Sequence, residues 1–201
     1  MKKIAVPLFC GLLALTACST SSLTDSEKAP VPETTTEFSG TVKTIDKSRS
    51  AISFVGKSNI VNHESKFNDY SAEVTLDPAE PANLEKASVK AEIDLTSAET
   101  DAKGLDGHLK REDFFNVDVH PKATFVSTGI VRKEGNTYTI SGDLTIKGVT
   151  KTITLDAEIT DDYLTAEYNL PREEFGIGNN SYGQKLLEPM VPVTIKLVFA
   201  E

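Results

Sequence analysis

Cysteine is almost absent from this chain. Its 201 residues contain only two cysteines, Cys10 and Cys18. The sequence that follows them can therefore form no disulfide and offers no thiol for catalysis or metal binding. The three histidines, His63, His108 and His120, lack the spacing of a metal site. We therefore expect neither a metal ion nor a cofactor.

Motifs of nucleophilic and phosphate chemistry are missing as well. The chain has no Gly-x-Ser-x-Gly elbow and no glycine-rich phosphate loop, which argues against an enzyme. Positive charge is scarce, since 21 Lys and Arg residues stand against 30 Asp and Glu residues, for a formal net charge of -9. Such a charge repels phosphate backbones, so nucleic acid is not expected as a partner.

The chain has no apolar run long enough to cross a membrane as a helix. Residues 4–14 are apolar, but a transmembrane helix needs about 20 such residues. The run follows Lys2 and Lys3, and its length suits the core of a signal peptide. It ends in Leu-Thr-Ala-Cys at positions 15–18, which resembles the bacterial lipobox. We expect a lipoprotein signal peptide over residues 1–17 and a lipid on Cys18, with an ordinary signal peptide cut near Ala17 as the alternative.

The segment after Cys18 has little to bury. Residues 18–37 are rich in Ser, Thr, Pro and acidic residues, which predicts a flexible tether. Ser19 follows the cysteine, and in enteric bacteria a residue other than Asp there favours the outer membrane. We expect a protein of the bacterial cell envelope, anchored to the membrane through lipidated Cys18 and facing the periplasm. The folded body is expected over residues 38–201.

Apolar and polar residues alternate through this body. The pattern is clearest in residues 88–95, 138–146, 153–159, 164–170 and 191–199, with shorter examples around residues 52–54, 74–76 and 123–125. It predicts about eight antiparallel strands, each with one apolar face. Gly142 stands at an inward position, which suggests a bend or bulge. Residues 104–115 lack alternation and predict one or two short helices.

Alternation alone does not decide whether the interior of this body is filled or hollow. A sheet with one apolar face must pack on a second sheet or curl onto itself, and eight strands suffice to enclose side chains or one small ligand. Several inward positions are small, namely Ala91, Ala157, Ala166 and Gly142, which hints at space. A filled sandwich and a hollow barrel both remain compatible with the pattern.

Four motifs follow one another in an order that is similar to that of a known family. Residues 107–117 read GHLKREDFFNV, 120–128 read HPKATFVST, 142–151 read GDLTIKGVTK and 172–177 read REEFGI. In this order they resemble the YceI-like family of periplasmic polyisoprenoid-binding proteins, and strand-like pattern continues on both sides. Two positions depart from the family pattern: Ser65 stands where glycine is usual, and Arg111 where serine is usual.

The resemblance implies an all-β, lipocalin-like antiparallel barrel that holds a long apolar ligand, such as a polyisoprenoid, an isoprenoid quinone or a similar lipid, and it makes a homodimer possible. The implied pocket residues are Phe114, Phe115, Phe125, Leu144, Ile146, Phe175 and Ile177, to which we add Phe54 and Phe67 from the first strands. The candidates for a polar cavity mouth are His63, His108, Asp113 and Arg172. Core packing is a simpler role for the aromatic residues than ligand contact.

The resemblance predicts a binding protein that carries or sequesters its ligand. Two alternatives remain. One is an envelope interaction lipoprotein whose barrel is a packed scaffold. The other is an enzyme that acts on a lipid through His63, His108 or Asp113.

Overall fold

The computed structural model describes residues 40–180 and 183–200. The predicted signal peptide, the lipidation site Cys18 and the predicted tether lie outside these residues. The described residues belong to one compact unit that covers Glu37–Glu201. Within them, no helix is both long enough and apolar enough to traverse a lipid bilayer.

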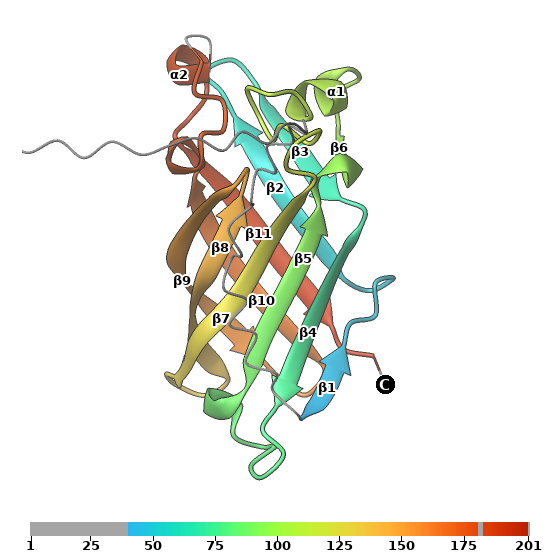
Figure 1. The fold of residues 1–201 in the computed structure, drawn as a ribbon, viewed down its shortest axis with the longest axis vertical. Helices are drawn as coiled ribbons and strands as arrows, with labels where there is room; N and C mark the ends of the chain where they lie inside the picture. Colours follow the sequence, from blue (N-terminus) through green and yellow to red (C-terminus); the bar gives the residue numbers. More distant parts are fainter. Residues whose placement is uncertain (1–39, 181–182, 201) are drawn as a thin grey trace, which may run out of the picture. The chain divides into compact units, whose positions relative to one another are not determined.

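The described residues form a single antiparallel sheet of eleven strands, strongly curled into a half-barrel (Figure 1). The strand order across the sheet is β1-β4-β5-β7-β8-β9-β10-β11-β2-β3-β6. The strands are β1 (Thr41–Thr44), β2 (Ala51–Lys57), β3 (Asn62–Phe67), β4 (Tyr70–Leu76), β5 (Ser88–Asp94), β6 (Ala98–Thr100), β7 (Lys122–Arg132), β8 (Thr137–Ile146), β9 (Val149–Ile159), β10 (Tyr163–Pro171) and β11 (Met190–Val198).

The expectation of about eight strands was wrong, because three strands carry no apolar alternation. Strands β1 and β6 have four and three residues, too few for a period to show. Strand β3 reads NHESKF and carries His63 and Ser65 on the face that also bears Phe67. Period-two analysis detects only strands whose inward face is apolar.

Short helices complete the unit. Helix α1 (Leu105–Leu109) falls within the segment predicted to be helical, and α2 (Gly183–Leu186) precedes β11. Three 3-10 turns are η1 (Leu84–Lys86), η2 (Leu95–Ser97) and η3 (Arg172–Phe175). Helices α1 and α2 both lie at the upper end of the sheet in Figure 1, and β1 lies at the lower end.

One bent hairpin supplies strands near both ends of the strand order. Strand β4 pairs with β5, where Tyr70 lies opposite Ile93, and the same two chain segments continue into β3 and β6, where Phe67 lies opposite Ala98. At the bend, the N–H of Asp94 donates to the Asp69 carbonyl at 3.0 Å. The hairpin therefore turns a corner, which bends the sheet toward the α1 end.

At the other end of the sheet, the residues that follow β1 pair with the residues that follow β11. Ile45 forms an isolated bridge with Phe199, and the N–H of Asp46 donates to the Val198 carbonyl at 2.8 Å. The first strand of the sheet order therefore meets the eighth at this end, which increases the curl.

A bulge and a tight turn shape the strands next to the site. The register of β7 shifts between Ser127 and Gly129, and Ser127 lies opposite Gly142 of β8, so the expected irregularity at Gly142 is confirmed. Lys147 and Gly148 connect β8 to β9 with φ values of 52° and 73°, which fits a two-residue hairpin turn with both residues left-handed. The Lys147 ammonium donates to the Gly176 carbonyl at 2.8 Å and so ties this turn to the chain after η3.

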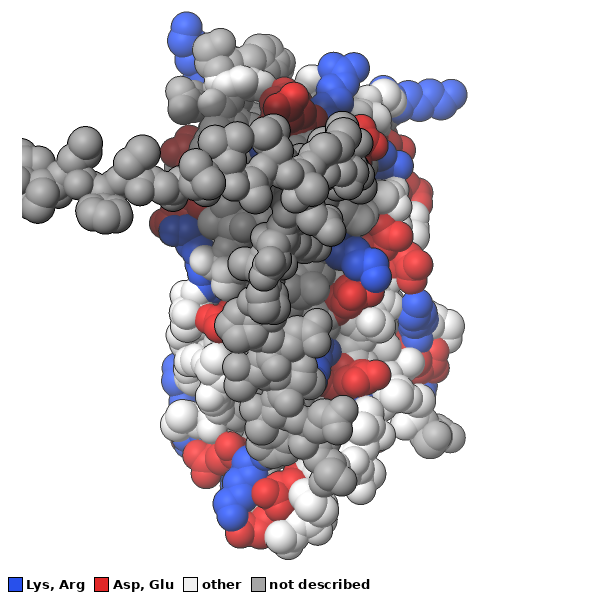
Figure 2. Space-filling model, in the orientation of Figure 1, with Lys and Arg blue, Asp and Glu red and all other residues white. Residues whose placement is uncertain are grey.

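The two faces of the sheet differ as the alternation predicts. In β9 every second side chain from Ile153 to Ile159 is buried and those between are exposed. Acidic and basic side chains are interspersed over the face seen in Figure 2. The apolar side chains turn inward and form two packed clusters, one at each end of the sheet.

Candidate ligand-binding cavity

A cavity of about 440 Å³ lies inside the curled sheet, lined by side chains from both packed clusters. The first cluster fills the end of the sheet near β1, where Tyr70, Tyr138 and Phe199 are buried and do not line the cavity. The second cluster contains Leu109 of α1 and Phe114. The cavity therefore lies between the packed end of the sheet near β1 and the end that carries α1.

Three phenylalanines form an aromatic group on one side of the cavity. The ring centroids of Phe54 and Phe67 lie 5.2 Å apart, and that of Phe115 lies 6.3 Å from Phe54 and 6.0 Å from Phe67. These distances lie within the range of attractive ring pairs. Phe114 also lines the cavity, and its ring contacts His108 edge-on at 4.9 Å.

Most of the predicted pocket residues do line the cavity. Phe125, Leu144, Ile146 and Ile177 face it together with the four aromatics above. Phe175 is the exception, because its side chain is completely buried in the second cluster and does not reach the cavity. It belongs to η3, where the alternation of a strand no longer decides which way a side chain points.

The polar residues predicted at the mouth have different environments. His63, His108 and Arg172 line the cavity, whereas Asp113 does not. The Asp113 carboxylate accepts a hydrogen bond from Asn180 Nδ2 at 2.7 Å, and its backbone carbonyl accepts from the Gly178 N–H at 2.7 Å. Asp113 therefore connects the segment after α1 to the segment after η3.

Arg172 is a buried structural connection at the mouth. Its side chain is 3% exposed, and its guanidinium donates to the carbonyls of Ile177, Gly178, Leu187 and Glu188 at 2.8–3.2 Å and to the Glu173 carboxylate at 3.1 Å. The five donors of an arginine fork are thus all used within the protein. Arg172 therefore holds η3 against the chain between α2 and β11.

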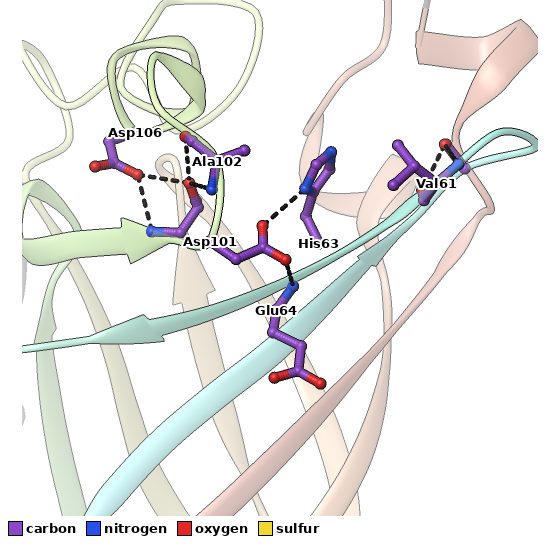
Figure 3. Close-up of polar contacts among 8 residues, drawn as sticks. Val61, His63, Glu64, Asp101, Ala102 and Asp106 are labelled. Carbon is purple, nitrogen blue, oxygen red and sulfur yellow. Dashed lines mark hydrogen bonds and ion pairs between the residues drawn. The ribbon is translucent and has the colours of Figure 1, made fainter.

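His63 is held by a carboxylate at the upper end of β3 (Figure 3). His63 Nδ1 lies 2.8 Å from Asp101 Oδ1, and Asp101 Oδ2 accepts a hydrogen bond from the Glu64 N–H at 3.3 Å. The hydrogen bond from the His63 side chain is the main reason that the pKa of Asp101 is below its usual value. Of the three residues considered for a lipid-acting enzyme, His108 Nε2 lies 3.9 Å from Asp113 Oδ2, whereas His63 is paired with Asp101 instead.

Tyr168 of β10 adds a phenol to the cavity wall. Burial raises the pKa of Tyr168, with a smaller contribution from Glu174. The phenol is therefore neutral at physiological pH. Within residues 40–180 and 183–200, no three His, Cys, Asp or Glu side chains are grouped as a metal site requires.

Sequence reasoning missed the entrance of the cavity. Ile60 and Val61, in the connection between β2 and β3, line it and are 81% and 49% exposed. This connection is joined to α2, because the Asn59 N–H donates to the Leu186 carbonyl at 3.0 Å. The only signal in the sequence was a pair of apolar residues in a turn.

Sequence reasoning also passed over part of the inner wall. Val191, Val193, Ile195 and Leu197 of β11 line the cavity, and their shared parity could have included them.

Comparison with known proteins shows related sequences. Protein YceI of Shigella flexneri is 42% identical over 93 residues, which cover 46% of this chain and 47% of that protein. A UPF0312 protein of Photorhabdus laumondii is 40% identical over 93 residues, with 46% of each chain covered. The chain thus spans about half the length of the curated relatives it matches.

Solved structures have a similar fold. The crystal structure of Burkholderia cenocepacia BcnA aligns with a TM-score of 0.69 at 29% identity, covering 77% of this chain and 98% of that one. A polyisoprenoid binding domain from Saccharophagus degradans aligns with a TM-score of 0.57 at 16% identity, covering 78% and 97% of the two chains, and shows the fold alone. The YceI-like domain family matches residues 44–199. This chain therefore belongs to the YceI-like domain family.

Proposed function

We propose that the protein binds a long apolar molecule of the isoprenoid or similar lipid class inside the curled sheet and carries or sequesters it. The observation that carries the proposal is the cavity of about 440 Å³ with a mainly apolar lining. Protein interiors are otherwise close-packed, and pockets for small ligands have volumes of about 300–1,000 Å³. Burial of a hydrocarbon in such a space contributes roughly 25 cal/mol for each Å² removed from water.

Two further observations support this proposal. A domain of the same fold from Saccharophagus degradans is described as polyisoprenoid binding. A fully packed barrel, the alternative that the sequence left open, does not fit a cavity of this size. The proposal includes the predicted envelope location, in which an anchor on Cys18 would keep the cavity close to a source of lipid.

The direct test is to purify the protein from its own host and to identify bound molecules by native mass spectrometry and organic extraction. We expect an apolar lipid to co-purify with the wild-type protein. Leu144→Asp and Phe114→Asp place a carboxylate on the cavity wall, and each should abolish lipid retention in a folded variant.

Val126→Asp is the matched control, because Val126 neighbours Phe125 on β7 but is 45% exposed and lies outside the cavity lining. This variant should retain lipid as the wild type does. An equal lipid load in Leu144→Asp, Phe114→Asp and the control would refute the proposed pocket.

A further inference from the structure

Two polar side chains interrupt the apolar wall on β3. His63, Ser65 and Phe67 all line the cavity, because alternate residues of a strand point to the same face. The residues between them, Glu64 and Lys66, are exposed on the outer face. His63 and Ser65 therefore stand next to each other along the inner face, on the strand that leads down from the entrance.

The orientation of His63 is fixed from outside the cavity. Two hydrogen bonds hold Asp101 against β3: its N–H donates to the Glu64 carbonyl at 3.1 Å, and its carboxylate accepts from the Glu64 N–H. Next to it, Asp106 accepts hydrogen bonds from the backbone N–H and the hydroxyl of Thr100 at 2.8 and 2.7 Å. Figure 3 shows these contacts side by side. The carboxylate that holds the imidazole is thus itself held.

This arrangement selects one tautomer of the imidazole. The pKa of Asp101 is below its usual value, so this side chain is a carboxylate at neutral pH and can only accept a hydrogen bond. The proton of a neutral His63 ring therefore resides on Nδ1. Nε2, on the side of the ring away from Asp101, is then an acceptor.

Ser65 supplies a hydroxyl two residues further along. Its side chain is buried, and its backbone lies opposite Phe54 and Thr100. Within the described residues, the Ser65 hydroxyl forms no hydrogen bond. The hydroxyl lies on the cavity wall, where its oxygen is accessible and can form a hydrogen bond with a polar group of a ligand.

We propose that His63 and Ser65 hold the polar end of the ligand, and that this end bears a hydroxyl group, as in a long-chain isoprenoid alcohol. The hydroxyl donates to His63 Nε2, and its oxygen accepts from the Ser65 hydroxyl. The hydrocarbon chain then extends along the apolar wall below β3. This inference rests on the proposed function, because it specifies which apolar molecule the cavity accepts.

The test uses three ligands with the same isoprenoid chain: farnesol, its methyl ether, and the hydrocarbon in which hydrogen replaces the hydroxyl. Affinities are measured by displacement of the fluorescent probe N-phenyl-1-naphthylamine from the delipidated full-length protein. Because dehydration of a hydroxyl opposes binding in every variant, the informative quantity is the ratio of alcohol affinity to hydrocarbon affinity. Hydrocarbon affinity reports whether the cavity is intact.

The variants separate the two polar contacts. His63→Leu should lower the alcohol-to-hydrocarbon ratio about tenfold and leave the ether-to-hydrocarbon ratio unchanged, because an ether has no proton to donate. Ser65→Ala should lower both ratios. Asp101→Asn should also lower the alcohol ratio, since a neutral amide no longer selects the tautomer, and it serves if His63→Leu fails to fold.

The outcomes distinguish this inference from the proposed function. If all three ligands displace the probe but the ratios are the same in wild type and variants, the inference is overturned and the apolar cavity stands. An equal fall of both ratios in His63→Leu overturns the assignment of a hydroxyl donor. If none of the ligands displaces the probe from the wild type, the proposed function fails and the inference fails with it.

Discussion

The ring of Phe125 occupies the space into which a side chain at position 142 would point. A Cβ atom on Gly142 would lie 2.4 Å from Phe125 Cζ and 2.6 Å from the carbonyl oxygen of Val126. Strand β8 can approach β7 in this way only because residue 142 is glycine. The missing side chain on the inward face is therefore replaced by an aromatic ring from the neighbouring strand.

Gly142→Ala should destabilise the protein by about 1–3 kcal/mol, as overpacking of a filled site does. The ring of Phe125 can rotate away, but the Val126 carbonyl belongs to the sheet and cannot. Urea unfolding of both proteins measures the effect. Gly129→Ala is the control, because a Cβ there meets no atom within 4 Å, and its stability should match the wild type. Equal stabilities of Gly142→Ala and Gly129→Ala would contradict this account.

Two inward alanines should respond in opposite ways to enlargement. Ala91 lines the cavity, so Ala91→Phe fills empty space and should lower the affinity for N-phenyl-1-naphthylamine at least tenfold without loss of stability. Ala157 is 1% exposed and outside the cavity lining, so Ala157→Phe should destabilise the fold by about 1–3 kcal/mol or more. Probe titration and thermal unfolding measure the two effects. Full probe binding by Ala91→Phe would place the cavity elsewhere.

Arg172→Met should cost about 3 kcal/mol or more of unfolding free energy. The substitution leaves several carbonyls at the mouth without their donor, and each buried group left unpaired costs about 1–3 kcal/mol. Denaturant unfolding checks this value. Arg111→Met removes an exposed arginine from the neighbouring loop and should change stability by less than about 0.5 kcal/mol. If the two variants were equally stable, Arg172 would not be a structural connection.

Acid should weaken the link between β1 and β11 through Asp46. Hydrogen bonds from the Ser48 side chain, then from Arg49, lower the pKa of Asp46 from 3.8 to about 2. Because the folded pKa lies below the unfolded one, this stabilisation is present above pH 3.8 and is lost as the pH falls toward 2.

The Asp46→Asn variant tests this contribution. It should melt at a lower temperature than the wild type at pH 6, and the difference should shrink at pH 2. Thermal unfolding at both pH values measures it. A difference that is independent of pH would show that the charge of Asp46 does not contribute.

Apolar alternation was sufficient to predict the strands that bury one face. In β8, β9 and β10 every second residue is apolar, and burial follows that parity, because the period of a strand fixes which face each side chain occupies. The same reasoning located Phe125, Leu144 and Ile146 on the inner wall. It failed at β3, where inward His63 and Ser65 removed the apolar signal.

The sequence by itself determined an antiparallel sheet with one apolar face, since side-chain parity is a local property of the chain. Whether that face encloses a cavity was decided by tertiary structure. Ala91 borders empty space, whereas Ala157 and Ala166 are packed and the space beside Gly142 holds Phe125. The pairing of His63 with Asp101 and the burial of Arg172 likewise depend on segments that only folding brings together. Empty volume depends on how neighbouring strands fill one another's gaps, and no single strand encodes it.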